Sequence, residues 1–522
     1  MSGVLRHRRL LFALLVVVVL AGIYEGAGAI RPAGAAGRAE VAAASRTPRA
    51  IVSTAVRVCP EPGSGTPPTS SVAIMAMSGS SSGSAPAGSA VVTPLTPAGS
   101  PSPGAVMATA KQPGTLHVFR APTAAPLTSA ELAGQAGSSS AVTTAGARGG
   151  VAVSASGAMA QGLEVEQTGP GGVVASQCGT PGTDFWFLGP GQQSAGVIDL
   201  YLMNAGSTPA DAQVSLLTDV TKGPPLLGNS DNGIAVPPHS MVVQSLVKLL
   251  QSSQVIALNV TTSSGQVVAA VRESRSASSY GSWLPATQAP ARKLVIPGLP
   301  SVSGTRDLYV GVPGTASAQV KITAVTPKGS YQPTGGTGID LLGDSTTSIP
   351  LPALAGVAGA ITISSSVPVV AVLRVPGGQP GSAGAFAVSG APIEEQGVLA
   401  ANPARSAGST DLVLSAPGKA ATVRITSATD SVSATGQSGR VVQIGARSSV
   451  LIAGAPPAGS HADQFAIVVT PLRGSGPVYG GQVITSGQKV RSILPVSSAL
   501  TWIPLPSVQE SLTAILAGEK SG

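Results

Sequence analysis

Apolar and polar residues alternate along much of the chain with the period of two that a half-buried β-strand requires. In the segment DAQVSLLTDV, Ala212, Val214 and Leu216 would share one face of a strand, and Gln213 and Ser215 would share the other. Helical spacing is rare, so the pattern predicts an all-β protein. Two helix candidates remain, at 240–250 and at 507–520.

An internal repeat divides this β pattern. DLYL at 199, DLYV at 307 and DLVL at 411 each open a unit, and each is followed by a second alternating strand. A spacing of roughly 105 residues with six or seven short strands per unit predicts tandem immunoglobulin-like β-sandwiches. A β-propeller-like arrangement is the alternative, and it would need two blades per unit because blades repeat at about 40 to 50 residues. The second strands are AQVSLLTDVTKG (212–223), AQVKITAVTPKG (318–329) and ATVRITSATDSV (421–432).

The stretch 51–180 resembles a diverged first unit with a long insertion. The residues 78–105 are rich in Ser, Gly and Pro, and this composition predicts a disordered loop or an extended edge. The strands expected around it are SVAIMAM (71–77), GTLHVFR (114–120) and GVAVSASGAMAQGLEVEQ (150–167).

The chain begins with an export signal. Basic residues at 6–9 precede an uninterrupted apolar run at 10–23 and small residues at 27–29. The signal is either cleaved or kept as a membrane-anchoring helix with its N-terminus inside, and in both cases the rest of the chain is extracytoplasmic. The predicted organisation is a signal or anchor (1–30), a flexible stalk (31–50), a diverged β-domain (51–180), three immunoglobulin-like domains (181–290, 291–390 and 391–505) and a tail (506–522).

The two cysteines, Cys59 and Cys178, fit an oxidising compartment. Their separation argues against a redox pair or a metal site, which need ligands a few residues apart. We expect a disulfide between them. The alternative is two separate buried thiols.

Charge is scarce and unevenly distributed. Only 10% of the residues are charged, and of the formal net charge of +8, the first 60 residues carry +6. The remaining chain is therefore nearly neutral and offers no basic stripe for a phosphate backbone. We expect no nucleic-acid partner.

The aromatic residues gather where units meet. Phe185, Trp186 and Phe187 are consecutive, Trp283 precedes the DLYV unit, and Trp502 follows the last unit. Rings at such junctions would fix the angle between neighbouring sandwiches. Exposed rings would instead stack on sugars, which makes these five residues candidate junction or binding aromatics.

The matches to known catalytic motifs lie in parts of the sequence where the motif could not adopt its catalytic structure. The match GSSSG (79–83) to a nucleophile elbow lies in low-complexity sequence, and the four histidines are scattered. The pair Glu164 and Glu166 would serve a glycosidase only if the two carboxylates faced each other across a cleft. We therefore predict no catalytic, cofactor-binding or metal-binding residues, no cofactor and no enzymatic activity.

Several segments resemble an uncharacterised family of exported actinobacterial proteins. They are the export signal, Cys59 with Pro60, GAMAQGLEVEQ (157–167), CGTPGTDFWFLG (178–189) and LYLMNAGSTPADAQV (200–214). The resemblance spans roughly residues 50 to 500 and brings no activity with it. Members tend to be encoded near a large membrane glycosyltransferase, which implies a role in surface-glycan assembly.

The sequence thus predicts a non-catalytic protein of the cell envelope, secreted or anchored by one helix, that is structural, adhesive or accessory to glycan assembly. Its expected partners are an envelope glycan or a membrane glycosyltransferase. The alternatives are a carbohydrate-binding protein and an envelope hydrolase with an interdomain site.

Overall fold

The described strands lie almost entirely within the unit Ile51–Trp502, and most of the other unit, Met1–Ala50 with Ile503–Gly522, lies outside the described residues. The predicted export segment and the helix candidate at 507–520 lie outside the described residues. Among the described residues, no helix has the length and apolar character needed to cross a membrane. The computed structural model describes residues 49–60, 70–77, 87–98, 108–110, 112–121, 125–126, 149–169, 174–191, 196–219, 233–246, 254–274, 281–354, 356–376, 384–403, 408–429, 432–435, 438–454, 464–487 and 489–505.

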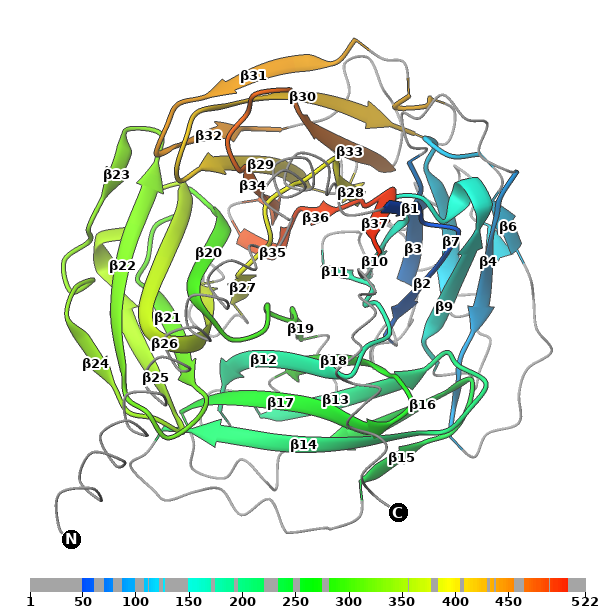
Figure 1. Ribbon diagram of the computed structural model, residues 1–522, viewed down its shortest axis with the longest axis horizontal. Helices are drawn as coiled ribbons and strands as arrows, with labels where there is room; N and C mark the ends of the chain where they lie inside the picture. The colour runs from blue at the N-terminus through cyan, green and yellow to red at the C-terminus, as the bar shows by residue number, and fades with distance from the viewer. Residues whose placement is uncertain are drawn as a thin grey trace, which may run out of the picture. The chain divides into compact units, whose positions relative to one another are not determined.

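One strand order recurs four times along the chain (Figure 1). If the strands of a repeat are lettered A, B, C, C′, D, E, F and G, one sheet has the order A-E-C-C′ and the other G-F-B-D. We call them the A-sheet and the G-sheet of that repeat. Most successive strands thus alternate between the two sheets, whereas C′ follows C, and G follows F, within one sheet. In the immunoglobulin order, by contrast, A, B, E and D share a sheet, so the immunoglobulin-like arrangement is not confirmed.

Repeats 1 and 2 each contain all eight strands. In repeat 1 they are β2 (Thr54–Cys59), β3 (Ser70–Met75), β4 (Ser89–Pro94), β6 (Ala108–Ala110), β7 (His117–Ala121), β9 (Val151–Ser156), β10 (Glu164–Thr168) and β11 (Ala175–Gln177), with β5 (Thr96–Pro97), β8 (Ala125–Pro126) and the 3-10 helix η1 (Gly157–Met159) in addition. In repeat 2 they are β12 (Asp184–Pro190), β13 (Val197–Asn204), β14 (Ala210–Thr218), β15 (Ile234–Val236), β16 (Ser240–Ser245), β17 (Val255–Ser264), β18 (Val268–Ser274) and β19 (Ser282–Leu284).

Repeats 3 and 4 keep this order, and in repeat 3 one long strand, β26, serves as both E and F. Repeat 3 contains β20 (Ala291–Leu299), β21 (Arg306–Val312), β22 (Ala318–Thr326), β23 (Gly329–Tyr331), β24 (Ile339–Leu341), β25 (Ser345–Leu351), the 3-10 helix η4 (Pro352–Leu354), β26 (Gly359–Val375) and β27 (Ala385–Val388). Repeat 4 contains β28 (Gly397–Pro403), β29 (Ser409–Ala416), β30 (Ala421–Ala428), β31 (Arg440–Ile444), β32 (Ser448–Ile452), β33 (Gln464–Pro471), β34 (Tyr479–Ser486) and β35 (Lys489–Pro495), and β36 (Ser497–Ser498) pairs with β28. Short strands β1 (Arg49–Ile51) and β37 (Trp502–Pro504) lie at the two ends.

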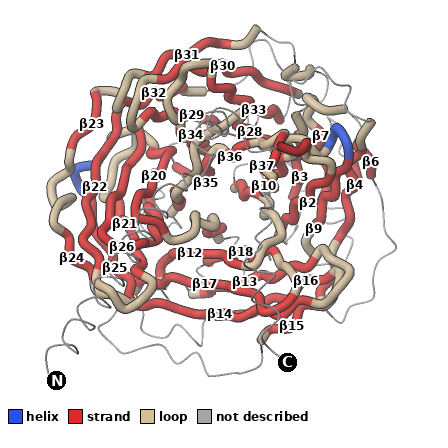
Figure 2. Tube along the Cα trace, in the orientation of Figure 1, coloured by secondary structure: helices blue, strands red, loops and turns tan. Residues whose placement is uncertain are grey.

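The all-β prediction is confirmed (Figure 2), whereas three local predictions are corrected. DLYL, DLYV and DLVL lie in the second strand of their repeats, and DFWFLGP (184–190) is the first strand of repeat 2. The helix candidate at 240–250 begins as strand β16, because its apolar residues pair with β13. Inside the polar insertion, Ser89–Pro94 forms strand β4, which pairs with β9 and buries Ala90 and Val92.

The aspartates of the repeated DLY motif form ion pairs with arginines on strand F. Asp199 lies 3.5 Å from Arg272, and Asp307 lies 3.5 Å from Arg374. In both cases the two residues are register partners on strands B and F. The recurring Asp therefore joins the same two strands of the G-sheet in repeats 2 and 3.

The inner strands of these sheets are buried on both faces. In β13, Leu200 and Leu202 point into the core of repeat 2, whereas Tyr201 and Met203 pack with Val58 of repeat 1. In β21, Leu308 and Val310 belong to the core of repeat 3, and Tyr309 packs against repeat 2. Each A-sheet thus packs on its own G-sheet and also on the G-sheet of the next repeat.

The last repeat closes onto the first. Val398 and Val468 of repeat 4 form one apolar cluster with Ala73 and Met75 of repeat 1. Polar contacts join the same two repeats, since Gln464 donates to Ser71 Oγ at 3.1 Å. The sheets of Ile51–Trp502 therefore follow one another round a closed ring. The sheets stack round the ring as the blades of a propeller do, although most successive strands alternate between two sheets, as they do in a β-sandwich.

Small residues allow this close packing. Gly298 of β20 faces Gly481 of β34, and a Cβ on Gly298 would lie 3.0 Å from the Cα of Gly481. A Cβ on Gly481 would clash with the backbone of Gly298. The A-sheet of repeat 3 and the G-sheet of repeat 4 thus meet backbone to backbone at this point.

We expect Gly481→Ala to lower the free energy of unfolding by about 1 to 3 kcal/mol, because the added methyl overpacks this contact. Thermal and chemical denaturation would measure the loss. Gly418→Ala is the matched control, since a Cβ there meets nothing within 4 Å. Equal stability of the two variants would contradict the close approach of the repeats.

Candidate functional site: a cavity lined by all four repeats

A cavity of about 420 Å³ is lined by residues from every repeat. Its wall is formed mainly by the end of β2, the region from Ser176 to Thr180, the residues around β19 and the segments that follow β27 and β35, with Glu164, Phe185 and the start of β18 in addition. These are mostly the ends of strand G and the linkers that leave it. The cavity is therefore built from the same topological position in each repeat.

The charged residues in the wall neutralise each other. Arg57 Nη2 lies 3.2 Å from Glu164 Oε1, and the two side chains are 19% and 8% exposed. Burial raises the pKa of Glu164, and the charge of Arg57 and hydrogen bonds from Arg57 and Ser497 act in the opposite direction. The pair joins strand A to strand F across the two sheets of repeat 1.

Apart from this ion pair, the polar groups of the cavity wall are mostly uncharged amides and hydroxyls. Gln177 Nε2 donates to the carbonyl oxygen of Pro495 and, at 2.9 Å, to Ser497 Oγ. The amide of Gln288, oriented to satisfy both neighbours, donates to Gly390 O and accepts from the N–H of Ala391. Amides and hydroxyls from repeats 1, 2 and 4 thus face the same space.

Two of the five candidate aromatics reach the cavity. Phe185 is half-buried in its wall, and Trp283 is buried there with an edge-on contact to Tyr201, at 5.3 Å between ring centroids. Trp283 also packs with Val58 of repeat 1, between repeats 1 and 2. Trp186 and Phe187 lie in the core cluster of repeat 2, and Trp502 is half-buried in β37 outside the cavity wall.

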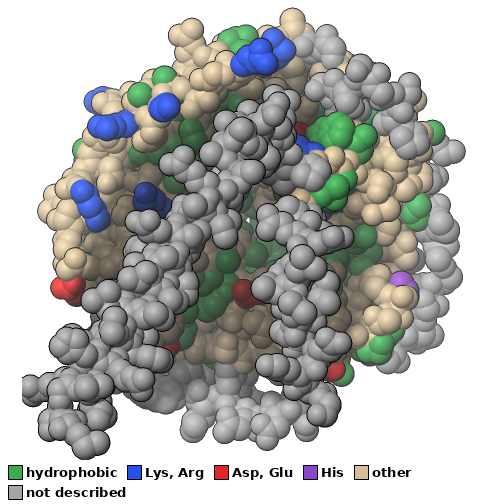
Figure 3. Space-filling view, in the orientation of Figure 1, with side chains coloured by type: hydrophobic (Ala, Val, Ile, Leu, Met, Phe, Trp, Pro, Cys, Tyr) green, Lys and Arg blue, Asp and Glu red, His purple; other side chains and the backbone are tan. Residues whose placement is uncertain are grey.

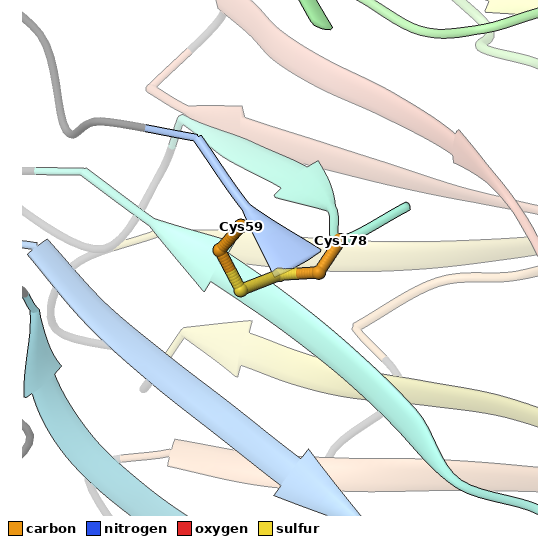
Figure 4. Close-up of a disulfide and its surroundings, with 2 residues drawn as sticks. All are labelled: Cys59 and Cys178. Atoms are coloured by element: carbon orange, nitrogen blue, oxygen red, sulfur yellow. A yellow bond between two sulfur atoms is a disulfide. The ribbon is translucent and has the colours of Figure 1, made fainter. Parts of the chain in front are cut away.

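The expected disulfide is present beside the cavity (Figure 4). Cys59 ends β2 and Cys178 follows β11, so the bond joins the two sheets of repeat 1. Val58 and Gly179 exchange backbone hydrogen bonds next to it, at 2.8 and 2.9 Å. A disulfide is compatible with an extracytoplasmic location.

Glu166 contributes to the closure between repeats 1 and 4 and does not line the cavity. The N–H of Ala401 donates to its Oε2 at 2.7 Å, while Oε1 has no hydrogen-bond partner among the described residues. Burial raises the pKa of Glu166 from its ordinary value of 4.5 to about 8, and the nearby Glu164 carboxylate also raises it. Gln482 supports the contact by donating to the carbonyl oxygen of Ala401 at 2.9 Å.

Glu164 and Glu166 are not arranged as a glycosidase pair. They lie two residues apart on β10, on the face opposite Val165, which packs in the core of repeat 1. A glycosidase needs its carboxylates on two sides of the bond that it cleaves. Within the described ranges there is also no group of three or more His, Cys, Asp or Glu side chains that could hold a metal ion.

Surface charge is sparse on the face shown in Figure 3. Lys and Arg side chains are scattered singly, and uncharged polar side chains and backbone cover most of the described surface in that view. The described residues visible in this view form no continuous basic track.

Sequence reasoning did not identify Arg57, Gln177, Gln288 and Ser497 as site residues. Each is the ordinary polar residue of a strand end or linker, and no local pattern marks it. The one available signal was Glu164 in a segment predicted to be a strand, since a carboxylate in a β-protein with so few charges requires a partner.

Comparison with known proteins identifies a family but no activity. A family model described as a family of unknown function (DUF5719) matches residues 132–453, which is more than half of the chain. The resemblance to an uncharacterised family is therefore confirmed, although the match is shorter than expected and excludes Cys59. No curated protein and no solved structure matches the chain.

We expect replacement of both Cys59 and Cys178 by Ser to lower the free energy of unfolding by roughly 4 to 5 kcal/mol, because the closed loop spans more than 100 residues. Urea denaturation with and without reductant would measure it. Reductant should destabilise the wild type and leave the double variant unchanged. If two thiols of the unreduced wild type could be alkylated, the disulfide between Cys59 and Cys178 would be absent.

Glu166 should make the protein less stable as the pH rises. Its folded-state pKa of about 8 exceeds the ordinary 4.5, so its protonation stabilises the fold fully below pH 4.5 and this contribution is lost as the pH rises through 8. Glu166→Gln should weaken the decline in melting temperature between pH 5 and pH 9. The exposed Glu394→Gln is the control, and an identical pH profile for Glu166→Gln and the wild type would refute this role.

Proposed function

The chain belongs to the DUF5719 family of unknown function, and we propose that it is a non-catalytic binding scaffold of the cell envelope, secreted or anchored by its N-terminal segment. The observation that carries the proposal is the cavity whose wall is shared by all four repeats. A closed ring of interlocked sheets holds such a site rigid, which favours binding over catalytic motion.

Three further observations support this function. The buried disulfide suits an extracytoplasmic compartment. The ionised groups in the wall are paired with each other, which suits recognition of neutral partners better than proton transfer. The sparse surface charge supports partners other than nucleic acid. We propose an envelope glycan, or a membrane glycosyltransferase that assembles one, as the partner.

Site-directed photocrosslinking in intact cells would test this proposal. A photoreactive residue at Thr180, which is exposed in the cavity wall, should capture envelope glycan or a membrane glycosyltransferase. Tyr331, exposed on β23 outside the cavity wall, is the control position and should not give the same product. The scaffold would be rejected if both positions gave identical products, or if Thr180 captured no envelope component.

A further inference from the structure

We propose that the cavity binds a neutral saccharide of one or two sugar units, with Phe185 as the stacking ring. The inference rests on the proposed binding function and names the class of its ligand. It follows from the size of the cavity, the charge of its wall and the kinds of groups that face it.

The size of the cavity limits the ligand. A volume of about 420 Å³ lies in the lower part of the range of about 300 to 1,000 Å³ that small-molecule sites occupy. A monosaccharide or a disaccharide fits such a space. A folded protein domain does not, so a large glycan would enter by one terminal unit.

The charges of the wall favour a neutral ligand. Arg57 and Glu164 are the charged side chains in the wall, and they lie 3.2 Å apart in an ion pair. An anionic ligand would have to draw Arg57 away from a carboxylate that is almost fully buried. Removing one partner from a buried pair is costly, so phosphate and carboxylate ligands are disfavoured.

The polar groups of the wall suit hydroxyls. Amides and hydroxyls both donate and accept hydrogen bonds, as sugar hydroxyls do. The wall contains the hydroxyls of Thr180, Ser497 and Ser498, and also the amides of Gln177 and Gln288, which are hydrogen-bonded to neighbouring segments. They come from repeats 1, 2 and 4, so a ligand would be held from several sides.

The aromatic part of the wall suits the apolar face of a sugar ring. Phe185 is half-buried, and Gly182 packs closely against the edge of its ring, since a Cβ on Gly182 would lie 3.1 Å from the ring atom Cζ. Val268, Leu284 and Pro285 extend the apolar surface around this ring. Trp283 is only 7% exposed and already contacts Tyr201, so it supports the wall and does not stack.

The wall also argues against a lipid chain. An acyl chain would remove water from the Arg57–Glu164 pair and from the hydroxyls of Thr180 and Ser498 without offering a hydrogen bond in return, which costs free energy. A saccharide satisfies these groups and covers Phe185 at the same time. The mixture of neutral polar groups with one accessible ring therefore favours a sugar.

Calorimetric titration of the full-length protein would test the inference. The probes are glucose, galactose, mannose, arabinose, N-acetylglucosamine, maltose and trehalose, with glucuronate and inorganic phosphate as charged comparisons. At least one neutral sugar should bind, and Phe185→Leu should weaken its binding about tenfold, which is about 1.4 kcal/mol. Tyr331→Leu, which removes an exposed ring outside the cavity wall, should bind like the wild type.

Two further variants separate binding from folding. Gln288→Met keeps the size of the side chain and removes its amide together with the hydrogen bonds of that amide to Gly390 and Ala391, so it should weaken binding of the same sugar, and its melting temperature shows whether the fold is kept. Glu164→Gln leaves Arg57 without its counter-charge and should create phosphate binding that the wild type lacks.

The inference is overturned if no neutral sugar binds at about 10 mM, if phosphate binds the wild type more tightly than any sugar, or if Phe185→Leu and Gln288→Met both bind like the wild type. Such a result would leave the scaffold function standing, provided that crosslinking at Thr180 still captured an envelope component. Loss of that crosslink together with retained sugar binding would reject the scaffold and keep the sugar site.

Discussion

The burial of the inner strands of the sheets on both faces is the constraint on which the rest of this structure depends. A strand such as β13 must supply Leu200 and Leu202 to one core and Tyr201 and Met203 to another, so it has no face left for solvated charge. This explains why only 10% of the chain is charged. Buried charges need polar contacts, and Arg306, which is 0% exposed, donates to the carbonyl oxygens of Val357 and Pro300. Doubly covered sheets also explain the many small residues, since Gly298 and Gly481 allow two sheets to approach at the level of their backbones.

The same constraint makes closure of the ring necessary. An open array would leave one apolar sheet face of repeat 1 and one of repeat 4 uncovered, including Met75 and Val468, and exposed patches of this kind promote association. Closure brings residues more than 200 positions apart into contact, and this ordering has a large entropic cost. The disulfide lies within repeat 1, where it holds together the two sheets that meet repeats 2 and 4. The disulfide therefore stabilises repeat 1, the repeat against which repeat 4 packs when the ring closes.

The sequence predicts what is local and misses what is shared between repeats. Alternation identified AQVKITAVT as a strand because Val320 and Ile322 are buried and Gln319 and Lys321 are exposed. It could not show that β28 is buried along its whole length, since Ala and Gly fit either face equally well. The strand Ser89–Pro94 was missed because its stability comes from pairing with β9, about 60 residues away, and because it lies within a stretch rich in Ser, Gly and Pro. The cavity was missed for a related reason, since its wall joins Arg57, Gln288 and Ser497 from three repeats and each is unremarkable in its own segment.

The position of the cavity follows from repetition of one topology. In every repeat the chain leaves strand G and runs to strand A of the next repeat, or past the last repeat, so four equivalent segments converge on the same space. These segments include Gln177, Gln288, Gly390 and Pro495, which lie at or just beyond the ends of β11, β19, β27 and β35. The side chains that build the cores lie on the strands, while those that face the cavity lie at strand ends and on linkers. A substitution in a linker can therefore change the chemistry of the cavity wall without disturbing the stacked sheets. The strands determine the position of the cavity, and the linker residues determine which groups face it.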